Sequence, residues 1–163
     1  MLRFPRILVG IPVYNEQQYV TSVLEEVRHH ADDVLVIDDG SSDDTPMLLA
    51  RQPVEVIRHA ENRGYGRSMQ DMLRWAHFDG FDWLITMDCD EQHEPAAIPK
   101  FVEAIRSNRA DIISGSRYAM ATPLDDAPPR GSPADQPDDH RRAQLAARSV
   151  DHRRFLRLQG LSR

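Results

Sequence analysis

The stretch "LITMDCDEQHEP", residues 84–95, places four carboxylates and a histidine directly after a short apolar run. Asp88 and Asp90 are separated by one residue, so their side chains can point the same way at a strand end, with Gln92 next in the series. Oxygen ligands of this kind suit Mg²⁺ or Mn²⁺, which also bind substrate phosphates. The residues alone leave three interpretations open: a metal site, an acidic surface turn, or the nucleophile loop of a Mg-dependent phosphatase-like hydrolase. The last also needs a downstream lysine, and the only lysine, Lys100, lies in the next expected helix.

A second polar motif, "VIDDGSSDDT", begins at the end of another apolar run. Asp38 and Asp39 are candidates to hydrogen-bond the base or ribose of a nucleotide, and Gly40 suits a tight turn. Helix capping would explain the residues that follow, which are Ser41, Ser42, Asp43, Thr45 and Pro46. The later "NRGYGRS" lacks the third glycine of a dinucleotide fingerprint, so Gly64 and Gly66 more plausibly let the backbone approach a ligand or a helix start.

Alternating strands and helices must position these motifs. Apolar runs predict buried strands at residues 7–11, 34–37 and 54–57, and further strands at residues 83–87 and 111–115. Helical periodicity predicts helices from residue 17 and over residues 47–52, 66–78 and 96–108. This order indicates an α/β sandwich with a mainly parallel sheet, in which ligands collect at the carboxyl ends of the strands. Four polar stretches follow strands and are expected to converge there as an active cleft: "PVYNE", "DDGSSDDT", "DCDEQH" and "SRY".

Length and composition limit the class of protein. The 163 residues suit one domain, and a single cysteine excludes a disulfide framework and a cysteine-rich zinc site. No apolar run reaches the roughly 18 residues of a membrane-spanning helix, and the N-terminal sequence lacks a signal-peptide pattern. We therefore expect a cytoplasmic protein. The charge is asymmetric, since residues 1–129 hold 22 acidic against 12 basic side chains and residues 130–163 hold four aspartates against eight arginines.

Five motifs in this order resemble the family-2 glycosyltransferases of the GT-A fold, and among them the polyprenyl-phosphate (dolichol-phosphate) mannosyltransferase type. The motifs are "IPVYNE", "VIDDGSSDDT", "ENRGYGRS", "MDCDEQHEP" and "ISGSRY". The resemblance covers about residues 5–118. It implies a Rossmann-like nucleotide-sugar-binding sandwich over residues 1–120, incomplete at the C-terminus, with an irregular tail over residues 121–163.

The resemblance also implies which residues act. Asp88 and Asp90 would serve catalysis and, with Gln92, hold Mg²⁺ or Mn²⁺ at the donor diphosphate. Contacts to the nucleotide sugar are expected from Pro12, Tyr14, Glu16, Ile37, Asp39, Asp88, Cys89, Asp90, Gln92 and Arg117. The implied reaction transfers a hexose, with mannose from GDP-mannose preferred over UDP-glucose as donor, to a polyprenyl phosphate. We expect no nucleic-acid partner, but peripheral contact with the inner face of the membrane. A non-catalytic nucleotide-sugar-binding fragment is the alternative.

The sequence departs from the family after "GSRY". A family segment of the type "D…CGFKAYR" is replaced by an arginine-rich tail with little apolar periodicity. One synonymous coding of residues 151–163, read one nucleotide later, gives "ITDAFCGFKAYR". The same shift can yield family-like pieces back to about Pro129. We therefore expect a frameshift there, which would make the basic charge of residues 130–163 uninformative about partners. An authentic divergent tail and a basic binding arm are the other interpretations.

Overall fold

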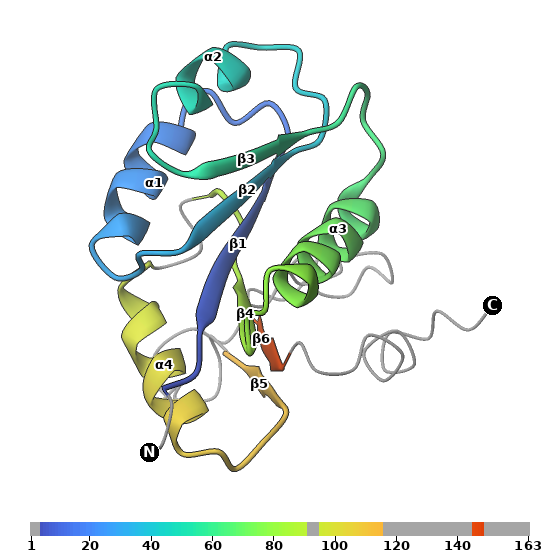
Figure 1. The fold of residues 1–163 in the computed structure, drawn as a ribbon. Coiled ribbons are helices and arrows are strands. Elements are labelled where there is room, and N and C mark those ends of the chain that lie inside the picture. The colour runs from blue at the N-terminus through green and yellow to red at the C-terminus, as the bar shows by residue number, and fades with distance from the viewer. Residues whose placement is uncertain (1–3, 91–94, 116–144, 149–163) are drawn as a thin grey trace, which may run out of the picture.

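The structure is a computed structural model that describes residues 4–90, 95–115 and 145–148, the last four by backbone alone. Within these residues six strands form one sheet in the order β3-β2-β1-β4-β6-β5 (Figure 1). The strands are β1 Ile7–Val13, β2 Val34–Asp38, β3 Glu55–Arg58, β4 Trp83–Thr86, β5 Ile112–Ser114 and β6 Leu145–Arg148. The helices are α1 Val20–Arg28, α2 Thr45–Leu49, α3 Tyr65–Phe78 and α4 Ile98–Arg106, the last preceded by the 3₁₀ helix η1 Pro95–Ala97.

Strand β1 lies at the centre of the parallel part of the sheet. It pairs with β2 in the register Val9↔Val34 and with β4 in the register Gly10↔Thr86, and β3 extends the sheet beyond β2. Strand β6 is antiparallel to both β4 and β5, so β5 again runs in the direction of β4. The predicted α/β architecture with a mainly parallel sheet is confirmed.

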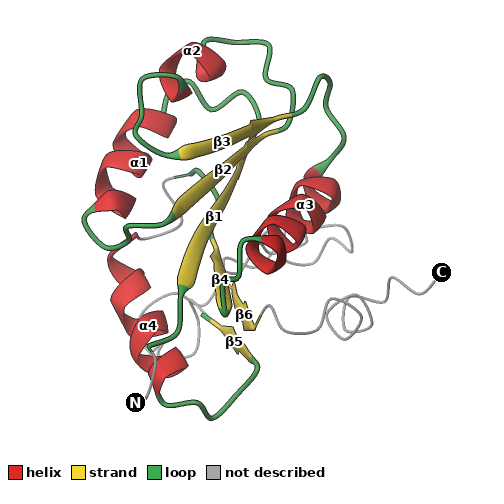
Figure 2. Cartoon of the chain, viewed as in Figure 1, coloured by secondary structure: helices red, strands yellow, loops and turns green. Residues whose placement is uncertain are grey.

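Helices cover both faces of this sheet, with α1 and α4 on one side and α3 on the other (Figure 2). Successive residues of a strand therefore enter different cores: Val34 and Val36 pack with α1 and α4, whereas Leu35 and Ile37 pack under α3. This explains why the central strands read as continuous apolar runs. Among the described helices, none is both long and apolar enough to cross a bilayer.

Three strands differ from the sequence-based expectation. Strand β1 continues through Pro12 instead of ending there, because its ladder with β4 stops at Gly10 and the missing N–H of the proline breaks no described pairing. The stretch at residues 54–57 was expected to be a buried strand, but β3 lies at the sheet edge with Glu55, Val56 and Arg58 exposed. Residues 145–148 belong to the tail that was expected to be irregular, yet they form β6.

Candidate functional site

The direction of chain connections reverses between β1 and β4. The chain runs from β1 outward through β2 to β3, then returns to place β4 on the other side of β1. In open parallel sheets such a switch point leaves a crevice at the carboxyl ends of the two strands, where ligands bind. The loop from Tyr14 to Glu16 follows β1 at this edge, and the loop from Met87 to Asp90 follows β4. Two of the predicted polar motifs therefore lie at the switch point.

The loops after β1 and β2 are held together by reciprocal hydrogen bonds. The backbone N–H of Asn15 donates to Ser41 Oγ (2.9 Å), and the N–H of Ser42 donates to Asn15 Oδ1 (2.8 Å). Further along, Asp44 N–H donates to Gln17 Oε1 (3.0 Å). Asn15 has φ of 56°, a left-handed conformation that asparagine tolerates better than most residues. Ser41 and Ser42, expected as helix-capping residues, instead fix the loop after β1.

The turn after β2 is built around Asp38 and Gly40. Asp38 is fully buried, accepts a hydrogen bond from Ser41 N–H (2.9 Å), and has its Oδ2 3.2 Å from Arg58 Nε, an ion-pair distance without hydrogen-bond alignment. This carboxylate therefore serves the turn, contrary to the expectation that it contacts a nucleotide. Gly40 has φ of 74°, and a Cβ there would lie 2.4 Å from the carbonyl carbon of Glu61, so the predicted tight turn is confirmed.

Asp39 is a hydrogen-bond centre at the same edge. Its Oδ1 lies 2.6 Å from His59 Nδ1 and accepts the backbone N–H of Arg63 (2.9 Å), while Oδ2 accepts the N–H of Gly64 (2.7 Å). Burial pushes the pKa of Asp39 upward, but the bonds from His59, Arg63 and Gly64 outweigh it and leave the pKa below its ordinary value. The side chain is thus a preorganised anion. Gly64, with φ of 86°, is the N-cap residue of α3, in agreement with the expected helix start.

The loop after β4 gathers negative charge around a buried thiol. Asp88 is 4% exposed and Asp90 half-buried, while Cys89 between them packs into the core. The pKa of Cys89 rises to about 12, first because of burial and then through the negative charges of Glu16, Asp90 and Asp88. Glu16, in the loop after β1, is one of the charges that act on this thiol.

The donor atoms of this loop fit a hard divalent cation. Asp88 and Asp90 offer carboxylate oxygens, and Mg²⁺ is commonly held by one or two carboxylates, with substrate phosphates and water completing its coordination. The side chain of Cys89 is 2% exposed and packs into the core, so it is not a candidate ligand. Across the described ranges no group of three or more His, Cys, Asp or Glu side chains is placed to hold a metal by itself. The arrangement therefore suits a cation shared with a diphosphate.

The other predicted contact residues differ in accessibility. Tyr14 is 45% exposed and Pro12 half-buried at the sheet edge, so both side chains can meet a ligand. The side chains of Ile37 and Cys89 are enclosed in the two cores, which leaves only their backbone for a donor. Gln92 and Arg117, and the whole "SRY" motif, lie outside the described residues.

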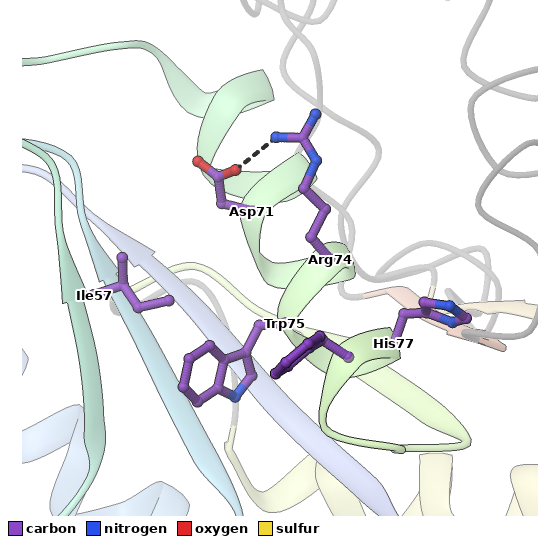
Figure 3. A pocket seen from close by; sticks show the side chains of 6 residues that line it. Ile57, Asp71, Arg74, Trp75 and His77 are labelled. Atoms are coloured by element: carbon purple, nitrogen blue, oxygen red, sulfur yellow. Dashed lines mark hydrogen bonds and ion pairs between the residues drawn. The ribbon is translucent and has the colours of Figure 1, made fainter.

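A separate open pocket of about 720 Å³ lies beside α3. Figure 3 shows its lining from β3 and α3, which comprises Ile57, Asp71, Arg74, Trp75, His77 and Phe78. None of these residues belongs to the predicted donor site. We place the functional site at the β1/β4 edge because carboxylates, a left-handed loop and the switch point coincide there.

Comparison with known proteins decides the family. The profile described as Glycosyl transferase family 2 matches residues 8–156. The chain belongs to glycosyl transferase family 2. This family-2 chain is 36% identical over 119 residues to the undecaprenyl-phosphate mannosyltransferase of Micrococcus luteus, covering 69% of the chain and 48% of that protein. It is 32% identical over 131 residues to the dolichol-phosphate mannosyltransferase of Pyrococcus furiosus, covering 76% and 36%.

Solved structures support the GT-A fold of this family-2 chain. Glucosyl-3-phosphoglycerate synthase from Mycobacterium tuberculosis, in a complex with Mn²⁺, UDP-glucose and phosphoglyceric acid, superposes with a TM-score of 0.65 at 20% identity. The match covers 89% of this chain and 57% of that one. The chain spans about half the length of the curated relatives it matches. Fold and family are therefore established for this half.

Sequence reasoning missed two residues that shape the site. Asn15 was quoted within a motif but was given no role, although it joins two loops. His59 was not identified at all, although both its ring nitrogens face carboxylates. The available signal was position, because each residue directly follows or lies near the end of a strand whose carboxyl end meets the same edge.

Proposed function

We propose that this chain is the donor-binding half of a family-2 glycosyltransferase that transfers a hexose from a nucleotide sugar to a polyprenyl phosphate. GDP-mannose is the preferred donor, followed by UDP-glucose, and the reaction depends on Mg²⁺ or Mn²⁺. The observation that carries this proposal is that Asp88 and Asp90 follow β4 directly, at the switch point of the sheet between β1 and β4. The names of the Micrococcus and Pyrococcus relatives support the acceptor class and the sugar.

Each part of the donor has residues suited to it. Tyr14 is exposed at the carboxyl end of β1 and offers an aromatic face to the nucleoside, while Asp39 offers an ionised acceptor. Asp88 and Asp90 would hold the cation at the diphosphate, together with Gln92, and Arg117 would pair with a phosphate. A divalent cation there would neutralise the charge of the departing nucleoside diphosphate.

The acceptor explains why the site needs no dedicated strong base. A phosphate monoester is already anionic at neutral pH, so its oxygen attacks the anomeric carbon without first losing a proton. The described carboxylates then serve to bind and orient the donor. Because a polyprenyl chain is held in a bilayer, this acceptor would bring the protein into peripheral contact with the inner, cytoplasmic face of the membrane.

A transfer assay tests this function. The chain is incubated with Mn²⁺, polyprenyl phosphate in vesicles, and GDP-mannose or UDP-glucose carrying a radioactive sugar. We expect label in the lipid fraction that requires both the cation and the phosphorylated lipid. Label transferred equally to a polyprenol without phosphate would contradict the proposed acceptor.

A binding fragment without turnover is the second candidate, because the chain spans about half of its curated relatives. It predicts Mn²⁺-dependent binding of GDP or UDP in a sample that transfers no sugar. A phosphatase-like hydrolase would instead release phosphate from an aryl phosphate and lose that activity on Asp88→Asn. Its required lysine is not supplied, since Lys100 is exposed on α4.

A further inference from the structure

His59 is a nearly buried imidazole, 8% exposed, that the proposed transfer chemistry does not use. Its Nδ1 lies 2.6 Å from Asp39 Oδ1 and its Nε2 lies 3.1 Å from Asp71 Oδ2. His59 directly follows β3, and its backbone N–H donates to the carbonyl of Asp38, the last residue of β2 (2.8 Å). One ring therefore connects the carboxyl edge of the sheet to helix α3.

The ionised Asp39 carboxylate only accepts hydrogen bonds, so the 2.6 Å contact with it needs Nδ1 of His59 as the donor. Asp71 is held on its other side by Arg67 Nε (2.7 Å) and Arg74 Nη1 (2.9 Å), the latter visible in Figure 3. The result is a continuous row of polar contacts from Asp39 through His59 and Asp71 to two arginines.

The same contacts determine what Asp39 can still accept. A carboxylate has about four acceptor positions, two on each oxygen. His59 and Arg63 N–H occupy both positions of Oδ1, and Gly64 N–H occupies one position of Oδ2. One position remains, on Oδ2, and the side chain keeps 6% exposure.

We propose that His59 is a positioning residue for the nucleoside, fixing Asp39 so that Oδ2 presents a single acceptor position to one N–H or O–H group of the ligand. This inference rests on the proposed function, in which Asp39 faces the nucleoside. Without the ring, Oδ1 loses one of its two donors and can turn toward the crevice. Asp39 would then bind the nucleoside in more than one geometry and more weakly.

Two isosteric variants separate the two ends of the imidazole. The amide nitrogen of asparagine lies near the place of Nδ1, so His59→Asn keeps a donor toward Asp39. The longer glutamine places its amide nitrogen near Nε2, so His59→Gln keeps a donor toward Asp71 and loses the one toward Asp39. Both variants replace the ring with a neutral amide, which makes each the control for the other.

Calorimetric titration with GDP and UDP in the presence of Mn²⁺ tests the inference, with inorganic pyrophosphate as a ligand that has no nucleoside. We expect His59→Gln to weaken the tighter nucleotide about tenfold to hundredfold, the range for a lost hydrogen bond to a charged group. His59→Asn should stay within about threefold of wild type, and pyrophosphate affinity within about twofold in both variants.

Each other outcome has a defined meaning. Equal nucleotide affinity in wild type and His59→Gln overturns the role of His59 and leaves the proposed function standing. A parallel loss for nucleotide and pyrophosphate, or a loss that His59→Asn does not recover, makes His59 a structural cross-link and overturns the inference. A wild-type protein that binds neither nucleotide overturns the proposed function, and the inference with it.

Discussion

Asp39 and Asp88 are both nearly buried carboxylates at one sheet edge, but their surroundings differ. Asp39 is surrounded by donors from His59, Arg63 and Gly64, whereas Asp88 lies in the acidic loop beside Cys89. Hydrogen-bond donors stabilise the ionised form of a carboxylate, and a bound cation offsets the repulsion among the carboxylates of an acidic loop. The two aspartates thus suit different parts of a nucleotide sugar: Asp39 the nucleoside, and Asp88 the diphosphate with its metal.

The lowered pKa of Asp39 predicts a pH dependence of stability. Since the folded pKa lies below the unfolded value near 3.8, the ionised carboxylate stabilises the fold above that value, and this contribution is lost as the pH falls through the folded pKa. The decrease in the free energy of unfolding between pH 5 and about pH 2.5 should therefore be smaller in Asp39→Asn than in wild type. Urea unfolding at each pH measures it, with Asp32→Asn at an exposed turn as control. An unchanged pH dependence in Asp39→Asn would contradict the hydrogen-bond network.

Cys89, the only cysteine, gives a second test at this scale. It is 2% exposed and has a pKa of about 12, so at pH 8 only about one thiol in ten thousand is ionised. Native protein should react with an aromatic disulfide reagent at least about a hundredfold more slowly than protein unfolded in urea. Rapid labelling of the native protein would show that the loop after β4 does not pack as described.

At the scale of elements, the carboxyl ends of β1, β2 and β4 carry the site, and the turn at Gly40 fixes their loops. Gly40→Ala introduces a Cβ 2.4 Å from the Glu61 backbone at φ of 74°, whereas Gly80 has the same φ and its nearest neighbour, Arg6 Nη1, lies 3.7 Å away. We expect Gly80→Ala to lower the free energy of unfolding by about 1 kcal/mol and Gly40→Ala by about 3 kcal/mol or more. Urea unfolding measures both. Equal costs would show that the turn after β2 does not approach residue 61.

The sequence predicted the described strands and helices of residues 7–114 closely. Buried parallel strands appear as continuous apolar runs, and surface helices carry their apolar residues on one face only. The prediction failed for β3 and β6, whose exposure or pairing depends on neighbouring strands. Strand β3 is as apolar at Val56 and Ile57 as a central strand, and only its edge position exposes it. Strand β6 has a short weak pattern, and its pairing with β4 and β5 is a long-range property.

In the candidate site, too, the sequence indicates local chemistry but not long-range contacts. The type and spacing of Asp88 and Asp90 suffice to suggest a cation, because ligand chemistry is local. The roles of Asn15 and His59 depend on partners 12 to 27 residues away, and a lone histidine or asparagine carries no spacing signal. Asp38 and Asp39 are adjacent in sequence but face different surroundings, which only the turn geometry separates.

At the scale of the whole molecule, the segment after β5 is where the sequence departs from the motifs of the family. We propose that residues 130–163 are translated out of frame, and sequencing of the gene decides this. We expect the next reading frame to encode a family-like stretch ending in a segment of the type "CGFKAYR". A next frame without that stretch would mean that the tail is authentic. The family match up to residue 156 and the pairing of β6 would agree with that result.

We propose that a divalent cation and a nucleotide sugar bind together at the β1/β4 edge. Calorimetric titration of the chain with GDP-mannose, with and without Mn²⁺, tests it most directly. We predict binding that requires Mn²⁺, is lost in Asp90→Ala by at least about a hundredfold, and is retained in Asp32→Ala at the exposed turn before β2. Binding of the same strength in Asp90→Ala, or without Mn²⁺, would contradict the account.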